Sequence, residues 1–358
     1  MPKRSKKKNV RPRYIPRRYL NFLPEYEDER IALLPWELVI SYLEVRDIVA
    51  VSLCSKNMSN LMTLNQSQST LDCDIDVHVQ NGKMSVEVEN YDNKEDKVIF
   101  NFGHVSKESS KTLLHANGGR MLAVKCQPDQ FKGVFDIWCL DSKCDYTMRA
   151  VIKHLTTLFG IDVNNFYINF TGKNQNFQFR RLCPRDFTVQ NMKFEGESHN
   201  GDIPFLISNV KVTESFIDKK ERNIGFVPAG KLACSSLIDC GNATWMNPEM
   251  FYSLNCHKAV LRRTRLTWLD IAEFVRRWKA APFSDKDNLV YMRCEVHDSN
   301  DKQCLETLLG RPVLACCRYS ASPQEFWSTK DQYDFLLTLT ITGNCHVSFR
   351  VTEPTDDE

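Results

Sequence analysis

The stretch that decides the fold reads AVLRRTRLTWLDIAEFVRRWK at residues 259–279, and NLVYM follows it at residues 288–292. Thr267 is a favourable N-cap, and Asp270, three residues later, can return a hydrogen bond to the cap. The apolar residues after the cap recur on one helix face: Trp268, Ile271, Ala272, Val275 and Trp278. The stretch therefore predicts a strand, a capped helix and a returning strand.

The large side chains of this helix fall into two groups. Trp268 and Trp278 share the apolar face, so we expect both in the core. Phe274 lies off that face and is the candidate for an exposed aromatic contact with a target, together with Arg276 and Arg277. The arginines of this block could bind an acidic target segment or nucleic acid.

Further elements flank this unit. Residues 146–159 predict an amphipathic helix that ends at Gly160, and residues 166–170 predict the strand after it. Residues 205–207 are candidates for a short strand. Asn81-Gly82 and Gly343-Asn344 separate alternating runs and predict two hairpins. We expect a mainly β region over 72–134 and an α/β domain over 135–350.

A second informative stretch lies near the start of the chain. It reads LPWELVISYL at residues 34–43 and RDIVAVSLCSK at residues 46–56. Pro35 suits the first turn of a helix, and Trp36, Val39, Ile40 and Leu43 share one helical face. Two or three short helices of this kind bury little surface among themselves, so the excess apolar area needs a partner.

The two stretches together resemble a nematode-type F-box protein, in which an F-box precedes an F-box-associated region. The associated region has the pattern Leu-Thr-x-x-Asp…Phe-x-x-x-Trp, which is read here at Leu266, Thr267, Asp270, Phe274 and Trp278. The F-box would span 31–66, after a basic arm and approach over 1–30. Either Leu34-Pro35 or Ile31-Ala32 fills the Leu-Pro position of the motif. The resemblance implies a small helical F-box followed by a larger mixed α/β (or α+β), leucine-rich-repeat-like domain.

The resemblance also implies partners. An F-box docks on a Skp-family adaptor and, through it, on a cullin, and the C-terminal domain binds a protein target for ubiquitination. The residues that would face the adaptor are Pro35, Leu38, Ile40, Leu43, Ile48, Val51 and Leu53. Such a substrate receptor supplies proximity rather than chemistry, so no catalytic residue and no cofactor are expected.

Charge is distributed unevenly along the 358 residues. The first 18 residues contain nine Lys or Arg and no acid, whereas the rest contains 38 basic and 45 acidic residues. Lys3, Arg4, Lys6, Lys7 and Lys8 could form a nuclear import signal or a phosphate-contacting tail, or simply belong to a solvated terminus. The alternative function is therefore a nuclear, nucleic-acid-associated protein, although the acidic remainder makes nucleic acid an unlikely partner.

Several classes of function lack support in the sequence. No apolar run approaches the roughly 20 residues of a membrane span, and no secretory signal follows the basic start. The 14 cysteines form no C-x-x-C pair, so we expect reduced thiols, no metal site and a cytoplasmic or nuclear location. Neither a glycine-rich phosphate loop nor a nucleophile elbow occurs. The sequence thus predicts a binding protein rather than an enzyme.

Overall fold

The structure is a computed structural model. It describes residues 42–54, 56–66, 72–80, 83–105, 112–116, 120–129, 133–140, 144–170, 182–183, 187–196, 205, 208–219, 232, 234–281, 289–297, 302–315, 324–331, 333–342 and 345–352.

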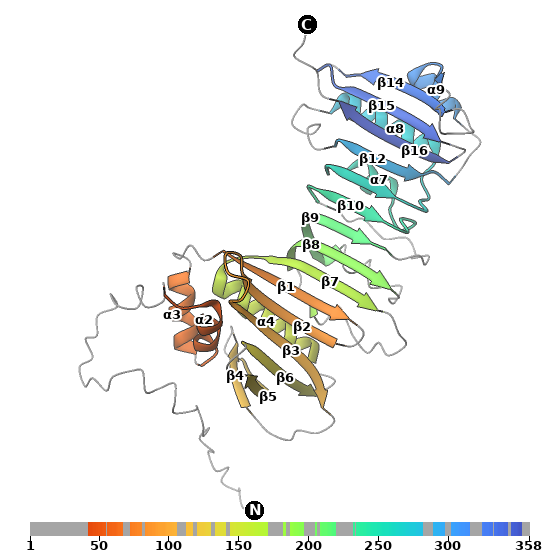
Figure 1. Ribbon diagram of the computed structural model, residues 1–358. Coiled ribbons are helices and arrows are strands. Elements are labelled where there is room, and N and C mark those ends of the chain that lie inside the picture. The colour runs from red at the N-terminus through yellow and green to blue at the C-terminus, as the bar shows by residue number, and fades with distance from the viewer. Residues whose placement is uncertain are drawn as a thin grey trace, which may run out of the picture.

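The described strands form one mixed sheet of sixteen (Figure 1). Its order is β13-β14-β15-β16-β12-β11-β10-β9-β8-β7-β1-β2-β3-β6-β5-β4. The expected mixture of helices and strands is therefore confirmed at the level of fold class.

The middle of the sheet is parallel. It comprises β7 (Val163–Phe170), β8 (Phe187–Gly196), β9 (Val210–Asp218), β10 (Leu237–Cys240), β11 (Lys258–Leu261) and β12 (Tyr291–Glu295). Each strand from β7 to β11 pairs with the next one along the chain. Parallel neighbours require a crossover connection rather than a tight hairpin turn.

The N-terminal end of the sheet is mostly antiparallel. It contains β1 (Cys73–Gln80), β2 (Lys83–Asn90), β3 (Lys97–Val105), β4 (Thr112–Ala116), β5 (Arg120–Asp129) and β6 (Val134–Leu140). The predicted β1–β2 hairpin is confirmed, because Gln80 pairs with Lys83 across Asn81-Gly82. β6 begins at the boundary expected near residue 135 and pairs with β3 and β5, so the sheet continues across that boundary.

The C-terminal end is an antiparallel meander. It contains β13 (Val313–Ala315), β14 (Gln324–Lys330), β15 (Leu336–Thr342) and β16 (His346–Thr352). β15 and β16 form the predicted hairpin, with Thr342 opposite His346. β16 pairs with β12, which joins the meander to the parallel strands.

The helices cover one face of the sheet. They are α2 (Val45–Ser52), α3 (Lys56–Gln66), α4 (Cys144–Phe159), α7 (Pro248–Tyr252), α8 (Trp268–Ala280) and α9 (Gln303–Leu309). Figure 1 shows α4, α7 and α8 behind the sheet and the pair α2 and α3 beside its N-terminal end. We call the helix side the covered face and the other side, which over β7 to β16 carries no helix in the described residues, the open face.

The strand pattern explains this arrangement. Buried and half-exposed residues alternate along β1 and β15, as in a sheet with one solvated face. The expected cap of α8 is confirmed, because Thr267 and Asp270 form a reciprocal capping box. α4 ends before Gly160, whose φ of 68° lies in the left-handed region.

The prediction of a short strand at residues 205–207 was wrong at Phe205, because this residue is helical.

Candidate interaction surface

The predicted adaptor residues have different environments. Pro35, Leu38 and Ile40 lie outside the described residues, as do the basic residues between Lys3 and Lys8. Ile48 is fully buried and Leu53 is 5% exposed, both within the core of this chain. Leu43 and Val51 are half-buried against that core. Among the described adaptor residues, Leu43 and Val51 therefore have the side-chain surface left for a partner.

Two buried polar contacts fix α2 to the rest of the chain. Oδ2 of Asp96, in the β2–β3 turn, accepts a hydrogen bond from the backbone N–H of Val45 at 2.8 Å. This long-range cap satisfies a donor at the helix N-terminus, where the N-cap residue Glu44 makes no side-chain cap. Oγ of Ser52, at the other end of α2, lies 2.8 Å from Nε2 of His154 on α4.

The contact with Ser52 fixes which ring nitrogen of His154 carries the proton, and burial keeps the ring neutral. The Ser52 hydroxyl donates to the carbonyl of Val49 at 2.7 Å, so its oxygen is free to accept the Nε2–H of a neutral His154. Burial lowers the pKa of His154 to about 4, because the charged ring would lose its hydration. His154 is therefore neutral at physiological pH and ties α4 to α2.

The predicted target-binding residues on α8 also differ in their burial. Trp268 and Trp278 are buried, as expected, but the prediction that Phe274 is exposed was wrong. Phe274 packs between Phe251 of α7 (ring centroids 4.9 Å apart) and Phe349 of β16 (5.3 Å). α7 and β16 thus bury a wider part of the α8 surface than the apolar face predicted from the sequence.

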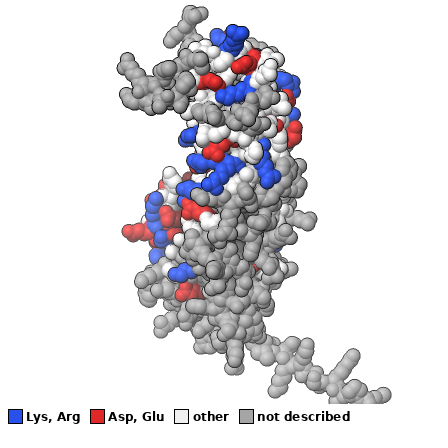
Figure 2. All heavy atoms as spheres, turned by 90° about the vertical axis from the view of Figure 1, so that its right-hand side faces the viewer, with Lys and Arg blue, Asp and Glu red and all other residues white. Residues whose placement is uncertain are grey.

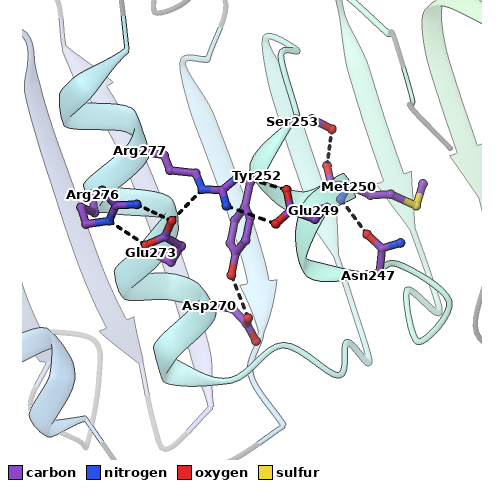
Figure 3. A network of polar contacts seen from close by, with 9 residues as sticks. All are labelled: Asn247, Glu249, Met250, Tyr252, Ser253, Asp270, Glu273, Arg276 and Arg277. Carbon is purple, nitrogen blue, oxygen red and sulfur yellow. Dashed lines mark hydrogen bonds and ion pairs between the residues drawn. The ribbon is translucent and has the colours of Figure 1, made fainter. Parts of the chain in front are cut away.

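Arg276 and Arg277 are exposed and lie in an ion-pair network between α7 and α8 (Figure 3). Arg277 binds Glu249 through both terminal nitrogens at 3.0 and 3.1 Å and Glu273 through Nε at 2.7 Å. Its guanidinium also lies 4.2 Å from the ring centroid of Tyr252. Hydrogen bonds from Arg276 and Arg277 lower the pKa of Glu273 to about 2. These two cations are already neutralised, so an acidic ligand would have to displace Glu249 or Glu273.

The open face presents rows of half-exposed polar residues. At its β1–β7–β8 end these residues bind one another. Asn164 donates to Asp74 at 2.5 Å, Asn165 donates to Asp76 at 2.8 Å, and the hydroxyl of Tyr167 donates to Glu195 at 2.6 Å. The Tyr167 hydroxyl and then Lys193 lower the pKa of Glu195. We call this the paired end of the open face.

The β11–β12–β16 end of the open face is different. Lys258, Arg293 and Arg350 are exposed on three neighbouring strands, and within the described chain none of them makes an ion pair or side-chain hydrogen bond. Lys258, Tyr291 and Arg350 form one cross-strand row, and Arg293 lies two residues further along β12. We call Lys258, Arg293 and Arg350 the cationic patch.

The nearest acids of the same face are already engaged. Asp239 binds Arg262 at 2.8 Å, and Glu295 accepts a hydrogen bond from the backbone N–H of Arg263 at 2.6 Å. His346 lies 3.3 Å from Glu295 as well. Among the described residues, these two carboxylates therefore have other partners and do not neutralise the patch.

Sequence reasoning missed the cationic patch. Arg293 and Arg350 each stand between buried neighbours in an alternating strand, a signal that marks them as outward-facing. Lys258 is the first residue of β11 and is followed by the buried Ala259. The members come together only because β16 returns beside β12, and this strand order is not visible in the sequence.

Two of the buried cysteines are inert thiols at neutral pH. Burial raises the pKa of Cys234 and Cys256 to about 12, so both thiols stay protonated at neutral pH. The described residues contain no group of three or more His, Cys, Asp and Glu placed to hold a metal ion. Within the same part of the chain, no helix is long and apolar enough to cross a bilayer.

Surface charge is mixed on the flank seen in Figure 2, where the coloured basic and acidic side chains are interspersed.

The comparisons with known proteins identify no family: no family model matches the chain, and no match was found among curated proteins or solved structures.

Proposed function

We propose that this chain is the non-catalytic substrate receptor of a Skp–cullin–F-box ubiquitin ligase. Its F-box-like segment, residues 31–66, docks on the Skp-family adaptor, and its leucine-rich-repeat-like α/β body binds the target protein. The receptor contributes proximity, since a tethered target meets the activated ubiquitin at a high effective concentration.

The attachment of α2 to the body carries this proposal. Asp96 holds the start of α2 and His154 holds its end, and Ile48 and Val49 are buried between them. A partner on the outer side of α2 and a target on the body would therefore keep a fixed separation. Such rigidity suits a receptor that must present its target to a second protein.

The burial of some predicted adaptor residues reduces the set that can contact the adaptor. Ile48 and Leu53 support the fold in this proposal, whereas Leu43 and Val51 contact the adaptor. Tyr42, which is 80% exposed directly before Leu43, extends the same surface. Exposed aromatic and aliphatic side chains of this kind are frequent anchors in protein interfaces.

The succession of parallel strands supports target binding by the body. Each strand from β7 to β12 pairs with its sequence neighbour, as in a solenoid whose repeats contact only adjacent repeats. Solenoids bind partners on extended, continuous surfaces. The open face, with its long rows of outward polar side chains, is such a surface.

Co-purification tests the proposal. Full-length chain is expressed with a Skp-family adaptor and a cullin, beside the variant Leu43→Glu/Val51→Glu and the control Leu269→Glu/Tyr146→Glu. The two control residues are 65% and 49% exposed and lie on α8 and α4. We expect the wild type and the control to retain the adaptor and the Leu43/Val51 variant to lose it. Failure of the folded wild type to retain the adaptor would refute the proposal.

A further inference from the structure

We propose that the cationic patch binds an acidic, Asp- and Glu-rich segment of the target in an extended conformation. This inference rests on the proposed function and adds to it the chemical class of the segment that the receptor recognises.

The spacing of the patch fits an extended peptide. Neighbouring strands lie roughly 4.8 Å apart, so Lys258 and Arg350, with Tyr291 between them, are separated by roughly 10 Å at their backbones. Arg293 lies two residues beyond Tyr291, roughly 6.6 Å along β12. Alternate side chains of an extended peptide repeat at the same roughly 6.6 Å, so carboxylates on alternate residues can reach different members of the patch.

The charge state of the patch favours an anionic partner. Elsewhere on the open face, Lys193 binds Glu195 and Arg262 binds Asp239. Within the described residues, Lys258, Arg293 and Arg350 have no such carboxylate, so an acidic ligand forms new ion pairs without breaking any that the structure describes. Hydroxyl groups adjoin the patch, since Thr338 lies opposite Arg350 and Ser348 lies opposite Arg293.

A peptide fits this surface better than a nucleic acid. Nucleic acid presents a long run of phosphates and is held by an extended positive groove with stacked aromatic residues. Here three cations are flanked by Asp239 and Glu295, and Tyr291 is the aromatic residue between them. A continuous phosphate chain would meet those carboxylates, whereas a short acidic segment need not.

The test measures peptide binding by full-length chain with fluorescence anisotropy. The probe is a labelled peptide of alternating Glu and Ser, and the variant is Lys258→Gln/Arg293→Gln/Arg350→Gln. The matched control, Lys83→Gln/Lys153→Gln/Arg311→Gln, removes three exposed cations outside the patch. We expect the patch variant to bind at least tenfold more weakly than the wild type, and the control to bind like the wild type. Binding should weaken from 50 to 300 mM salt.

Several outcomes would overturn the inference. One is equal affinity of the wild type and the patch variant, and another is an equal loss in the control. A third is tighter binding of a deoxythymidine oligonucleotide of matched charge at the same patch. A fourth is peptide binding that appears only after deletion of residues 353–358, since the acidic tail of the chain would then be the occupant.

The same proteins are assayed for adaptor retention and for thermal unfolding. A folded wild type that retains the adaptor but ignores the peptide refutes this inference alone. A wild type that binds the peptide but not the adaptor refutes the proposed function alone.

Discussion

The two ends of the open face belong to one sheet and both present outward polar residues, yet the side chains at the two ends differ in their partners. At the paired end, Asn164 donates to Asp74 and accepts a hydrogen bond from the backbone N–H of Ile75. At the β11–β12–β16 end, Arg293 and Arg350 have no side-chain partner in the described chain. This difference shows that outward polar residues of a sheet can either hold strands together or remain available to a ligand.

The largest expected effect concerns the covered face beneath the cationic patch. Phe274→Ala removes a ring packed against Phe251 and Phe349 and should lower the free energy of unfolding by about 3–5 kcal/mol. Leu269→Ala, on the exposed side of the same helix, should change it by less than about 0.5 kcal/mol. Urea denaturation measures both. Similar values for the two variants would mean that α8 does not support this end of the sheet as described.

The next effect concerns the helices behind the paired end and depends on pH. The folded pKa of His154 is about 4, below the 6.5 of a free histidine, so the unfolded chain takes up this proton first as the pH falls. The wild type should therefore lose up to about 3 kcal/mol of stability between pH 6.5 and 4 through this residue. His154→Gln removes the titration, so the stability advantage of the wild type over the variant should shrink across that interval. Parallel pH profiles of the two proteins would show that His154 is not held neutral.

A smaller effect tests the paired end itself. Asn164→Ala breaks the bond to Asp74 and leaves the N–H of Ile75 without its side-chain acceptor. We expect a loss of about 1–2 kcal/mol of unfolding free energy. Urea denaturation beside Asn101→Ala, whose bond to Asp136 is exposed, provides the comparison. A loss no greater than that of the Asn101 variant would contradict a structural role for this row.

The smallest effect on stability is expected at the cationic patch. Lys258→Ala, Arg293→Ala and Arg350→Ala each remove an exposed side chain that makes no ion pair in the described chain. Each should change the free energy of unfolding by less than about 0.5 kcal/mol. A loss above about 1 kcal/mol in thermal or urea unfolding would show that the residue has a structural partner.

The sequence predicts local features of this molecule and misses long-range ones. The α8 cap depends on Thr267 and Asp270 alone, and the β1–β2 register depends on the turn and the alternation beside it. Phe274 was misplaced because its burial depends on α7 and β16, which lie elsewhere in the chain. Asp96 caps a helix 51 residues away, and the cationic patch needs the strand order, so neither leaves a local signal.

The most direct test of the account measures two quantities on the same two variants. Asn164→Ala and Arg293→Ala are each assayed for unfolding free energy and for affinity to the acidic peptide. We predict a crossed result: the Asn164 variant loses stability and binds normally, whereas the Arg293 variant keeps its stability and binds more weakly. Equal losses of stability in the two variants, or an unchanged affinity of Arg293→Ala, would contradict these separate roles of the two ends.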